Sequence, residues 1–203
     1  MGGSSAVKAR RKANPADERL FDRELEDLPP ELRWREWMLR VEAVIFASSE
    51  PVTRETLARV VGKGCSIDLL IDDLREELGS RPYELVSVAG GWQHRSRSAY
   101  ADAIRASMAP TRGGAAALSE FEAMVLMAVG YFQPVTRGEL SKIFGKEVSR
   151  DLIGALRNAG FLASGPRSPT PGAPYTYVTT KHFLSAFGME TLRDLPDIEA
   201  LED

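Results

Sequence analysis

The sequence predicts a mostly helical α+β protein built from two tandem winged-helix domains. Two observations predict it: a segment that occurs twice, and a change from helical to strand-like periodicity after each copy. Residues 51–69 (PVTRETLARVVGKGCSIDL) align without gaps with residues 134–152 (PVTRGELSKIFGKEVSRDL), and ten of nineteen positions are identical. Because a repeat of this kind marks a duplicated structural unit, the 203 residues are better divided between two small domains than placed in one large one.

Each unit is expected to open with an amphipathic helix. Large apolar residues recur there at three- and four-residue spacing, which is the spacing of one buried helix face. They are Trp34, Trp37, Met38, Val41, Val44 and Ile45 in the first unit, and Leu118, Phe121, Met124, Val125 and Ala128 in the second.

A short second helix and a third helix are expected next, because hydroxyl residues stand where N-caps are needed. Ser119 and Thr136 each have a glutamate three residues on, so the capping-box pattern predicts helix starts at Glu120 and Arg137. The other expected caps are Thr53, Ser66 and Ser149.

After the third helix the pattern becomes strand-like in both units. A Gly90-Gly91 turn, which can take positive φ, predicts a hairpin in the first unit, and the proline-rich GPRSPTPGAP predicts a longer one in the second. The expected strands are residues 83–89, 92–97, 161–164 and 175–180, followed by final helices over 99–108 and 181–187. Three helices and a hairpin make a winged helix.

Composition along the chain predicts the domain boundaries. The front of the chain is too polar and charged to build a core, and PTRGGAAA is typical of a linker. The expected parts are a charged tail (1–33), a first winged-helix domain (34–109), a linker (110–117), a second winged-helix domain (118–190) and an acidic tail (191–203).

The sequence contains few residues that could act in catalysis or bind a metal. Cys65 is the single cysteine, so an internal disulfide and a thiolate metal cluster are excluded, and a reducing cytoplasm is expected. His94 and His182 are expected to be ordinary structural residues, and no phosphate-binding loop is present. No apolar run approaches the roughly 18 residues of a membrane span, and no secretory signal is expected. We therefore expect no enzyme, cofactor, metal or membrane contact.

Charge argues against sequence-specific DNA reading. The net charge is −3, and the expected third helix of the first unit carries five carboxylates against Arg75 alone. In the second unit that helix has Arg150 and Arg157 but no cluster that reads base edges. Gln93, Arg95 and Arg97 occupy every second position of an expected strand in the first hairpin, so they share one face. Weak, nonspecific contact of this face with phosphates is an alternative that the sequence leaves open. A DNA-binding transcriptional regulator is the alternative function.

The sequence predicts neither an active site nor a helix that reads bases in the major groove of DNA. The remaining function for two winged helices is to bind proteins through apolar faces. Large aromatic residues that could anchor such contacts are Trp34, Trp37, Trp92, Phe132, Tyr175 and Tyr177.

Several strings resemble the segregation and condensation protein B (ScpB) family, the small non-SMC subunit of bacterial condensin. The most specific are YFQPVTRGELSKIFG at residues 131–145 and GAPYTYVTTKHFLSAFGMETLRDLP at residues 172–196. EAVIFASSEPVTRETLARVVG at residues 42–62 and SVAGGWQHRSRSAYA at residues 87–101 are also similar to that family's first domain.

The resemblance implies a non-catalytic adaptor in chromosome condensation, chromosome segregation and cell division. It implies a homodimer formed chiefly by the first domain, and a second domain that binds the ScpA kleisin and, through it, the SMC ATPase. The implied location is the cytoplasm, at the nucleoid, with only weak or indirect DNA contact. The positions expected to bind the partner are Tyr131, Phe132, Gln133, Pro134, Tyr175 and Tyr177.

The chain departs from the family pattern at three places in the second unit. Phe132 and Ala173 stand where the family usually has arginine, and Phe144 begins a stretch where it has an Arg-Gly-Val-like element. Because these positions lie near the expected partner site, they leave the identity of the kleisin open.

Overall fold

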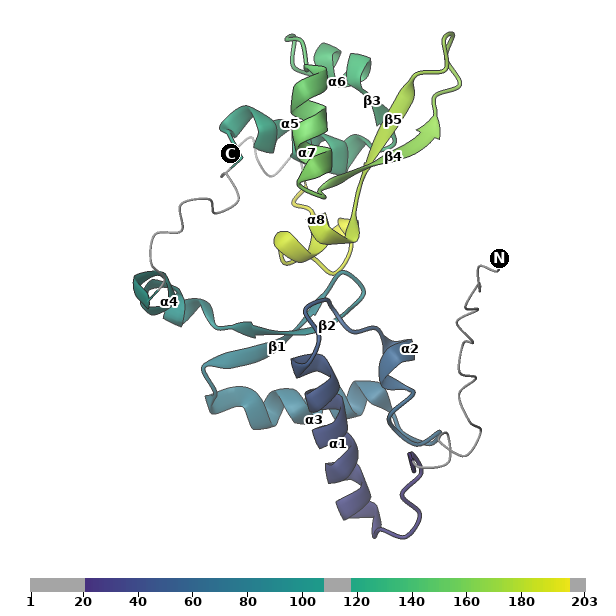
Figure 1. Ribbon diagram of the computed structural model, residues 1–203, viewed down its shortest axis with the longest axis vertical. Coiled ribbons are helices and arrows are strands. Elements are labelled where there is room, and N and C mark those ends of the chain that lie inside the picture. The colour runs from purple at the N-terminus through teal and green to yellow at the C-terminus, as the bar shows by residue number, and fades with distance from the viewer. Residues whose placement is uncertain (1–20, 108–117, 198–203) are drawn as a thin grey trace, which may run out of the picture.

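A computed structural model describes residues 21–107, here the N-terminal segment, and residues 118–197, here the C-terminal segment. Both mix helices with a small antiparallel sheet (Figure 1), which confirms the mixed fold class. The N-terminal segment contains α1 (Pro30–Phe46), α2 (Arg54–Leu57), α3 (Ile67–Glu77), β1 (Tyr83–Val88), β2 (Gly91–Ser96) and α4 (Ala101–Ser107). The C-terminal segment contains α5 (Glu120–Phe132), β3 (Val135–Thr136), α6 (Arg137–Ile143), α7 (Arg150–Asn158), β4 (Leu162–Arg167), β5 (Tyr175–Thr179) and α8 (Lys181–Ala186). Short 3₁₀ helices lie at Leu78–Ser80, Ser98–Tyr100 and Leu192–Asp194.

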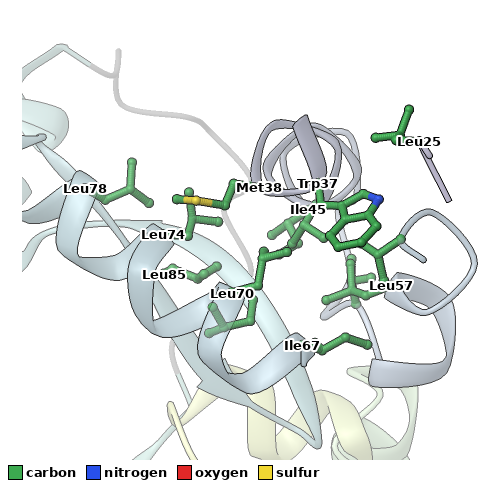
Figure 2. Packing of buried hydrophobic residues seen from close by; sticks show 14 residues of the cluster. Leu25, Trp37, Met38, Ile45, Leu57, Ile67, Leu70, Leu74, Leu78 and Leu85 are labelled. Carbon is green, nitrogen blue, oxygen red and sulfur yellow. The ribbon is translucent and has the colours of Figure 1, made fainter. Parts of the chain in front are cut away.

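The buried apolar residues of each segment form a cluster of their own. In the N-terminal segment, Val41 of α1, Leu57 of α2 and Leu70 of α3 are completely buried in one cluster. Figure 2 shows how α1, α2 and α3 each supply side chains to it. The C-terminal cluster is built in the same way, with Leu140 of α6 and Leu156 of α7 completely buried.

The first helices bury mostly the expected faces. In α1, Trp37, Met38, Val41 and Ile45 are buried, as predicted. In α5 the prediction of Met124 is wrong, because its side chain is exposed. Helix α5 is apolar along almost its whole length, so periodicity alone does not distinguish its buried face.

The caps agree with the sequence at four of five positions. Ser119 and Thr136 form complete capping boxes with Glu122 and Glu139. Thr53 and Ser149 each accept a hydrogen bond from a first-turn amide. The prediction for Ser66 is wrong, because its side chain makes no capping hydrogen bond although its backbone is extended as in the other caps.

The hairpin β1–β2 turns one residue earlier than expected. Ala89 and Gly90 take the positive φ values of 51° and 75°, and Gly91 already belongs to β2. Gly91 is required for another reason: a Cβ there would lie 2.7 Å from the carbonyl oxygen of Val52. This close approach arises because Val52 and Trp92 exchange backbone hydrogen bonds of 2.8 and 2.9 Å.

The sheet of the C-terminal segment has three strands in the order β3–β5–β4. The sequence pattern missed β3, where Val135 pairs with Tyr177. The prediction that the first strand of this hairpin ends at Ser164 is also wrong. Strand β4 continues to Arg167 because an irregularity in the register accommodates the Gly165-Pro166 pair.

Both expected tails are too long. Leu25 is only 8% exposed within the N-terminal cluster, and the indole nitrogen of Trp37 donates a 2.8 Å hydrogen bond to the Arg23 carbonyl. The tail prediction is therefore wrong for residues 21–33, where Leu25 and Leu28 pack on the N-terminal cluster. It is wrong for residues 191–197 too, since Leu195 packs on the C-terminal cluster. Residues 1–20, 108–117 and 198–203 lie outside the described residues.

The two segments meet where α8 lies next to the tip of the β1–β2 hairpin (Figure 1). The Ala89 amide donates a 2.9 Å hydrogen bond to the Met189 carbonyl. Among the helices of the described ranges, none is both long and apolar enough to cross a membrane.

Candidate partner-binding surfaces

Two of the six expected partner-binding residues serve the fold. The Gln133 side chain accepts a 2.8 Å hydrogen bond from the Thr179 amide and donates one of 3.1 Å to the Thr179 hydroxyl. It thereby ties the end of α5 to the end of β5. The Tyr131 hydroxyl donates a 2.6 Å hydrogen bond to the Pro196 carbonyl, which fastens residues 191–197 to α5.

Phe132 and Pro134 lie instead on an open surface. They line a groove of about 450 Å³ together with Val135, Glu139, Lys142 and Ile143, here called the Phe132 groove. The side chain of Phe132 is 50% exposed and that of Ile143 is 48% exposed. Ile143 was not among the expected binding residues, although an isoleucine in the last turn of a capped helix was the available signal. Apolar side chains between a glutamate and a lysine suit the contact of a protein partner.

Tyr175 and Tyr177 lie on a different groove, of about 710 Å³, between α6, α7 and β5. Arg137, Arg150 and Arg157 line it with them, and we call it the arginine groove. The structure thus separates the six expected residues instead of bringing them together in one site.

The phosphate contacts expected at Arg95 and Arg97 stay a prediction, and both guanidinium groups have hydrogen-bond partners within the chain. Arg95 donates to the Ser185 carbonyl at 2.6 Å and to the Gln93 side chain at 3.2 Å. Arg97 donates to the Arg81 carbonyl at 2.9 Å and pairs with Glu84 at 3.0 Å. The sequence pattern placed Arg95 on its strand correctly, but Arg97 follows the end of β2, and the pattern did not show the internal hydrogen bonds that both side chains form.

A second apolar surface lies on α1. Leu32, Leu39 and Phe46 are exposed, and Phe46 reaches 80%. Because seven residues make nearly two helical turns, these three side chains form a single stripe along α1, here called the α1 stripe. The buried residues of α1 face the N-terminal cluster, so the stripe is a separate surface of the same helix.

The three candidate reactive residues lie in structural settings. Both ring nitrogens of His94 are buried without a hydrogen-bond partner among the described residues, and burial lowers its pKa. Its ring meets Tyr83 edge-on at 5.5 Å, while His182 stacks on Phe161 at 5.2 Å. Burial raises the pKa of the Cys65 thiol to about 11, so the thiol is protonated and weakly nucleophilic at neutral pH. Residues 21–107 and 118–197 contain no cluster of three or more histidine, cysteine or acidic side chains suited to a metal ion.

The two remaining departures from the family pattern have structural roles. The Phe144 ring packs edge-on against Phe121 at 5.5 Å, next to the C-terminal cluster. Ala173 lies in the tip of the β4–β5 hairpin, where its carbonyl accepts a 3.0 Å hydrogen bond from Arg167. Of the three departures, only Phe132 therefore changes the surface of the Phe132 groove.

Comparison with known proteins identifies the family. A family model described as "Segregation and condensation complex subunit ScpB" matches residues 39–198. The segregation and condensation protein B homolog of Coxiella burnetii is 31% identical over 170 residues, which cover 80% of this chain and 79% of that protein. Segregation and condensation protein B of Moorella thermoacetica is 33% identical over 162 residues, covering 78% and 81%. The crystal structure of ScpB from Mycobacterium tuberculosis is 22% identical, with coverage of 77% of this chain and 97% of that chain and a TM-score of 0.35. The match of the family model over most of the sequence shows that the chain belongs to the ScpB family of segregation and condensation complex subunits.

Proposed function

We propose that the chain is a non-catalytic adaptor of an SMC–kleisin complex in chromosome condensation, chromosome segregation and cell division. In this proposal it forms a homodimer through its first domain and binds the ScpA kleisin through its second. The two domains are tandem winged helices. The support for them is the order of three helices and a hairpin in both segments, and the separate apolar cluster in each.

The observation that carries kleisin binding is the Phe132 groove. In a family of complex subunits, a groove with two half-exposed apolar side chains is a surface that a partner would cover. Phe132 is its largest side chain, and large aromatic side chains in such positions supply much of the binding free energy of an interface.

The α1 stripe supports the homodimer. Leu32, Leu39 and Phe46 would be buried if α1 packed against α1 of a second copy, and seven-residue spacing is the repeat that paired helices use. A dimer formed by α1 leaves the C-terminal segment of each copy free to bind a kleisin.

A sequence-specific DNA regulator is less well supported. Helix α3 occupies the place of a recognition helix but carries Asp68, Asp72 and Asp73, which repel phosphates. The arguments for this function are the similarity of the fold to DNA-binding winged helices and the arginines Arg95, Arg97, Arg150 and Arg157, and fold alone does not establish function.

The binding site is tested by Phe132→Ala, with Met124→Ala as the matched control. Both side chains are apolar, about half exposed and on α5, but only Phe132 lines the groove. We expect Phe132→Ala to weaken binding of the ScpA encoded in the same genome by about tenfold or more, the scale of a hot-spot residue, and Met124→Ala to leave it unchanged. Isothermal titration calorimetry on the purified proteins measures both. Unchanged affinity for a folded Phe132→Ala variant would exclude the groove as the kleisin site.

A further inference from the structure

The arginine groove has a counterpart at the same place in the first repeat. In the N-terminal segment a cleft of about 330 Å³ is lined by Arg54 of α2, residues of α3, and the β1–β2 hairpin. In the C-terminal segment the arginine groove is lined by Arg137 of α6, residues of α7, and β5. Arg54 and Arg137 are equivalent positions of the aligned repeat. The chain therefore offers an internal comparison between two grooves of the same origin.

The groove of the N-terminal segment is neutralised by its own residues. Arg54 pairs with Asp68, and Arg75 pairs with Asp72 at 3.4 Å. All four side chains line the cleft, and Glu190 from the C-terminal segment adds a further carboxylate. This groove has no excess positive charge to offer.

The arginine groove is not neutralised in this way. Arg137 pairs with Glu147 at 3.3 Å, but Arg150 and Arg157 of α7 are exposed and form no ion pair within the described segments. None of the residues that line this groove carries a carboxylate. A third exposed arginine, Arg167, lies beside it and donates a 2.8 Å hydrogen bond to the Tyr175 hydroxyl. Positive charge is therefore concentrated here in a protein whose net charge is negative.

Two glycines leave the walls of this groove open. A Cβ at Gly154, in the middle of α7, would meet no atom within 4 Å, and one at Gly138, in α6, would meet only the Thr136 hydroxyl at 3.9 Å. Glycine inside a helix is destabilising relative to alanine, and neither position needs glycine for internal packing. Both glycines do allow a ligand to approach the backbone closely.

The lining favours a phosphate ligand over an apolar peptide. Ile153, the aliphatic residue of the floor, is buried and presents almost no surface. One face of the Tyr175 ring is already covered by the Arg167 guanidinium, whose carbon lies 4.0 Å from the ring centroid. The groove also presents the guanidinium groups of Arg150 and Arg157 and the tyrosine hydroxyls, and these groups recognise phosphate oxygens.

We propose that the arginine groove binds the phosphate backbone of duplex DNA without reading its sequence. Arg150 and Arg157 supply the charge, and the helix α7 and the hairpin β4–β5 lie side by side to receive one strand of the duplex (Figure 1). The groove has no asparagine or glutamine for adenine edges, and the proposal assigns its arginines to phosphates, so that duplexes of any sequence bind alike. This contact goes beyond the proposed adaptor function and is separate from the Phe132 groove, so that kleisin and DNA occupy different faces.

The test compares Arg150→Ala/Arg157→Ala with a control that removes the same charge elsewhere. Arg59→Ala/Lys63→Ala is that control, because both residues are exposed and lie outside the arginine groove. Fluorescence anisotropy measures binding of the full chain to a labelled duplex of about 30 base pairs over a series of salt concentrations. We expect the Arg150/Arg157 variant to lose at least tenfold in affinity at low salt. Its slope of log K against log salt should fall by about two, one for each lost phosphate contact.

Three further binding measurements complete the test. The Arg59/Lys63 control should bind the duplex within twofold of the unchanged protein, and duplexes of unrelated sequence should bind equally. The Arg150/Arg157 variant should still bind ScpA, which separates this proposal from the adaptor function. The proposal is overturned if both variants lose affinity equally or if the salt slope does not change. A competition experiment adds poly-L-glutamate or unlabelled duplex to the complex of protein and labelled duplex. The proposal is also overturned if poly-L-glutamate displaces the labelled duplex at a lower concentration of charge than unlabelled duplex does. That last result would assign the groove to an acidic protein segment.

Discussion

His94 lies on β2 with both ring nitrogens buried and its edge against Tyr83. Burial disfavours the charged imidazolium and lowers the pKa of His94 below its ordinary value of about 6.5, while Glu42 opposes this shift. Below about pH 6.5 the unfolded chain therefore binds more protons at this position than the folded chain does. The stability that this neutral histidine contributes is complete above that pH and is lost as the pH falls.

His94→Phe tests this linkage, because phenylalanine keeps an aromatic ring beside Tyr83 without a titratable group. We expect the unchanged protein to lose more stability between pH 7.5 and pH 5.5 than the variant does. Urea unfolding of both proteins at the two pH values measures the difference. An equal loss of stability in the two proteins would show that His94 is protonated as easily in the folded chain as in the unfolded one.

The hydrogen-bond partners of single residues were the hardest feature to predict from the sequence. Alternation along a strand correctly placed Arg95 on β2, but the carbonyl that it binds belongs to Ser185, ninety residues away. Gln133 was expected to meet a partner and instead bonds Thr179 across the C-terminal segment. Local patterns contain no information on such distant partners, so the candidate site could be predicted only as a set of residue types.

The N-caps of α6 and α3 differ in their hydrogen bonds. The Thr136 hydroxyl accepts a hydrogen bond from the Glu139 amide at 3.2 Å, and the Glu139 carboxylate in turn accepts from the Thr136 amide at 2.8 Å. The Thr136 hydroxyl also donates a 2.8 Å hydrogen bond to that carboxylate, and the bonds from the Thr136 amide, first, and from its hydroxyl lower the pKa of Glu139. Ser66 occupies the N-cap of α3 but makes no such bond. The two caps therefore differ in energy although the sequence suggests the same role for both.

Thr136→Ala and Ser66→Ala measure that difference. We expect Thr136→Ala to lower the free energy of unfolding by about 1 kcal/mol, the usual value for a lost N-cap. Ser66→Ala should change it by only a few tenths of a kcal/mol, about the level of a neutral surface substitution. Urea unfolding at pH 7 gives both values. Equal losses in the two variants would mean that Ser66 caps α3 in solution.

Elements were predicted better than single contacts. The repeat, the caps and the change of periodicity indicated the helices and both hairpins, because each depends on nearby residues. Strand β3 was missed because two residues show no periodicity, and Val135 is a strand only through its pairing with Tyr177. The tails were drawn too long for a similar reason: Leu25 and Leu195 are isolated in sequence, and only the packed structure shows the clusters that they join.

At the scale of the whole molecule, contacts between the segments set the position of the proposed surfaces. The Arg95–Ser185 and Ala89–Met189 hydrogen bonds hold α8 against the β1–β2 hairpin. The α1 stripe belongs to the N-terminal segment, and the Phe132 and arginine grooves belong to the C-terminal segment. In the proposed assembly, a dimer formed by α1 would present two Phe132 grooves for kleisin and two arginine grooves for DNA.

Light scattering during size-exclusion chromatography tests the adaptor function most directly. The chain is measured alone and mixed with the ScpA encoded in the same genome, at low salt and at about 1 M salt, where charge interactions beyond a few ångströms are screened. We predict twice the 22.3 kDa chain mass for the protein alone, and a larger complex with ScpA that persists at high salt because apolar contacts hold it. A monomer whose mass ScpA does not change at either salt concentration would contradict the adaptor function.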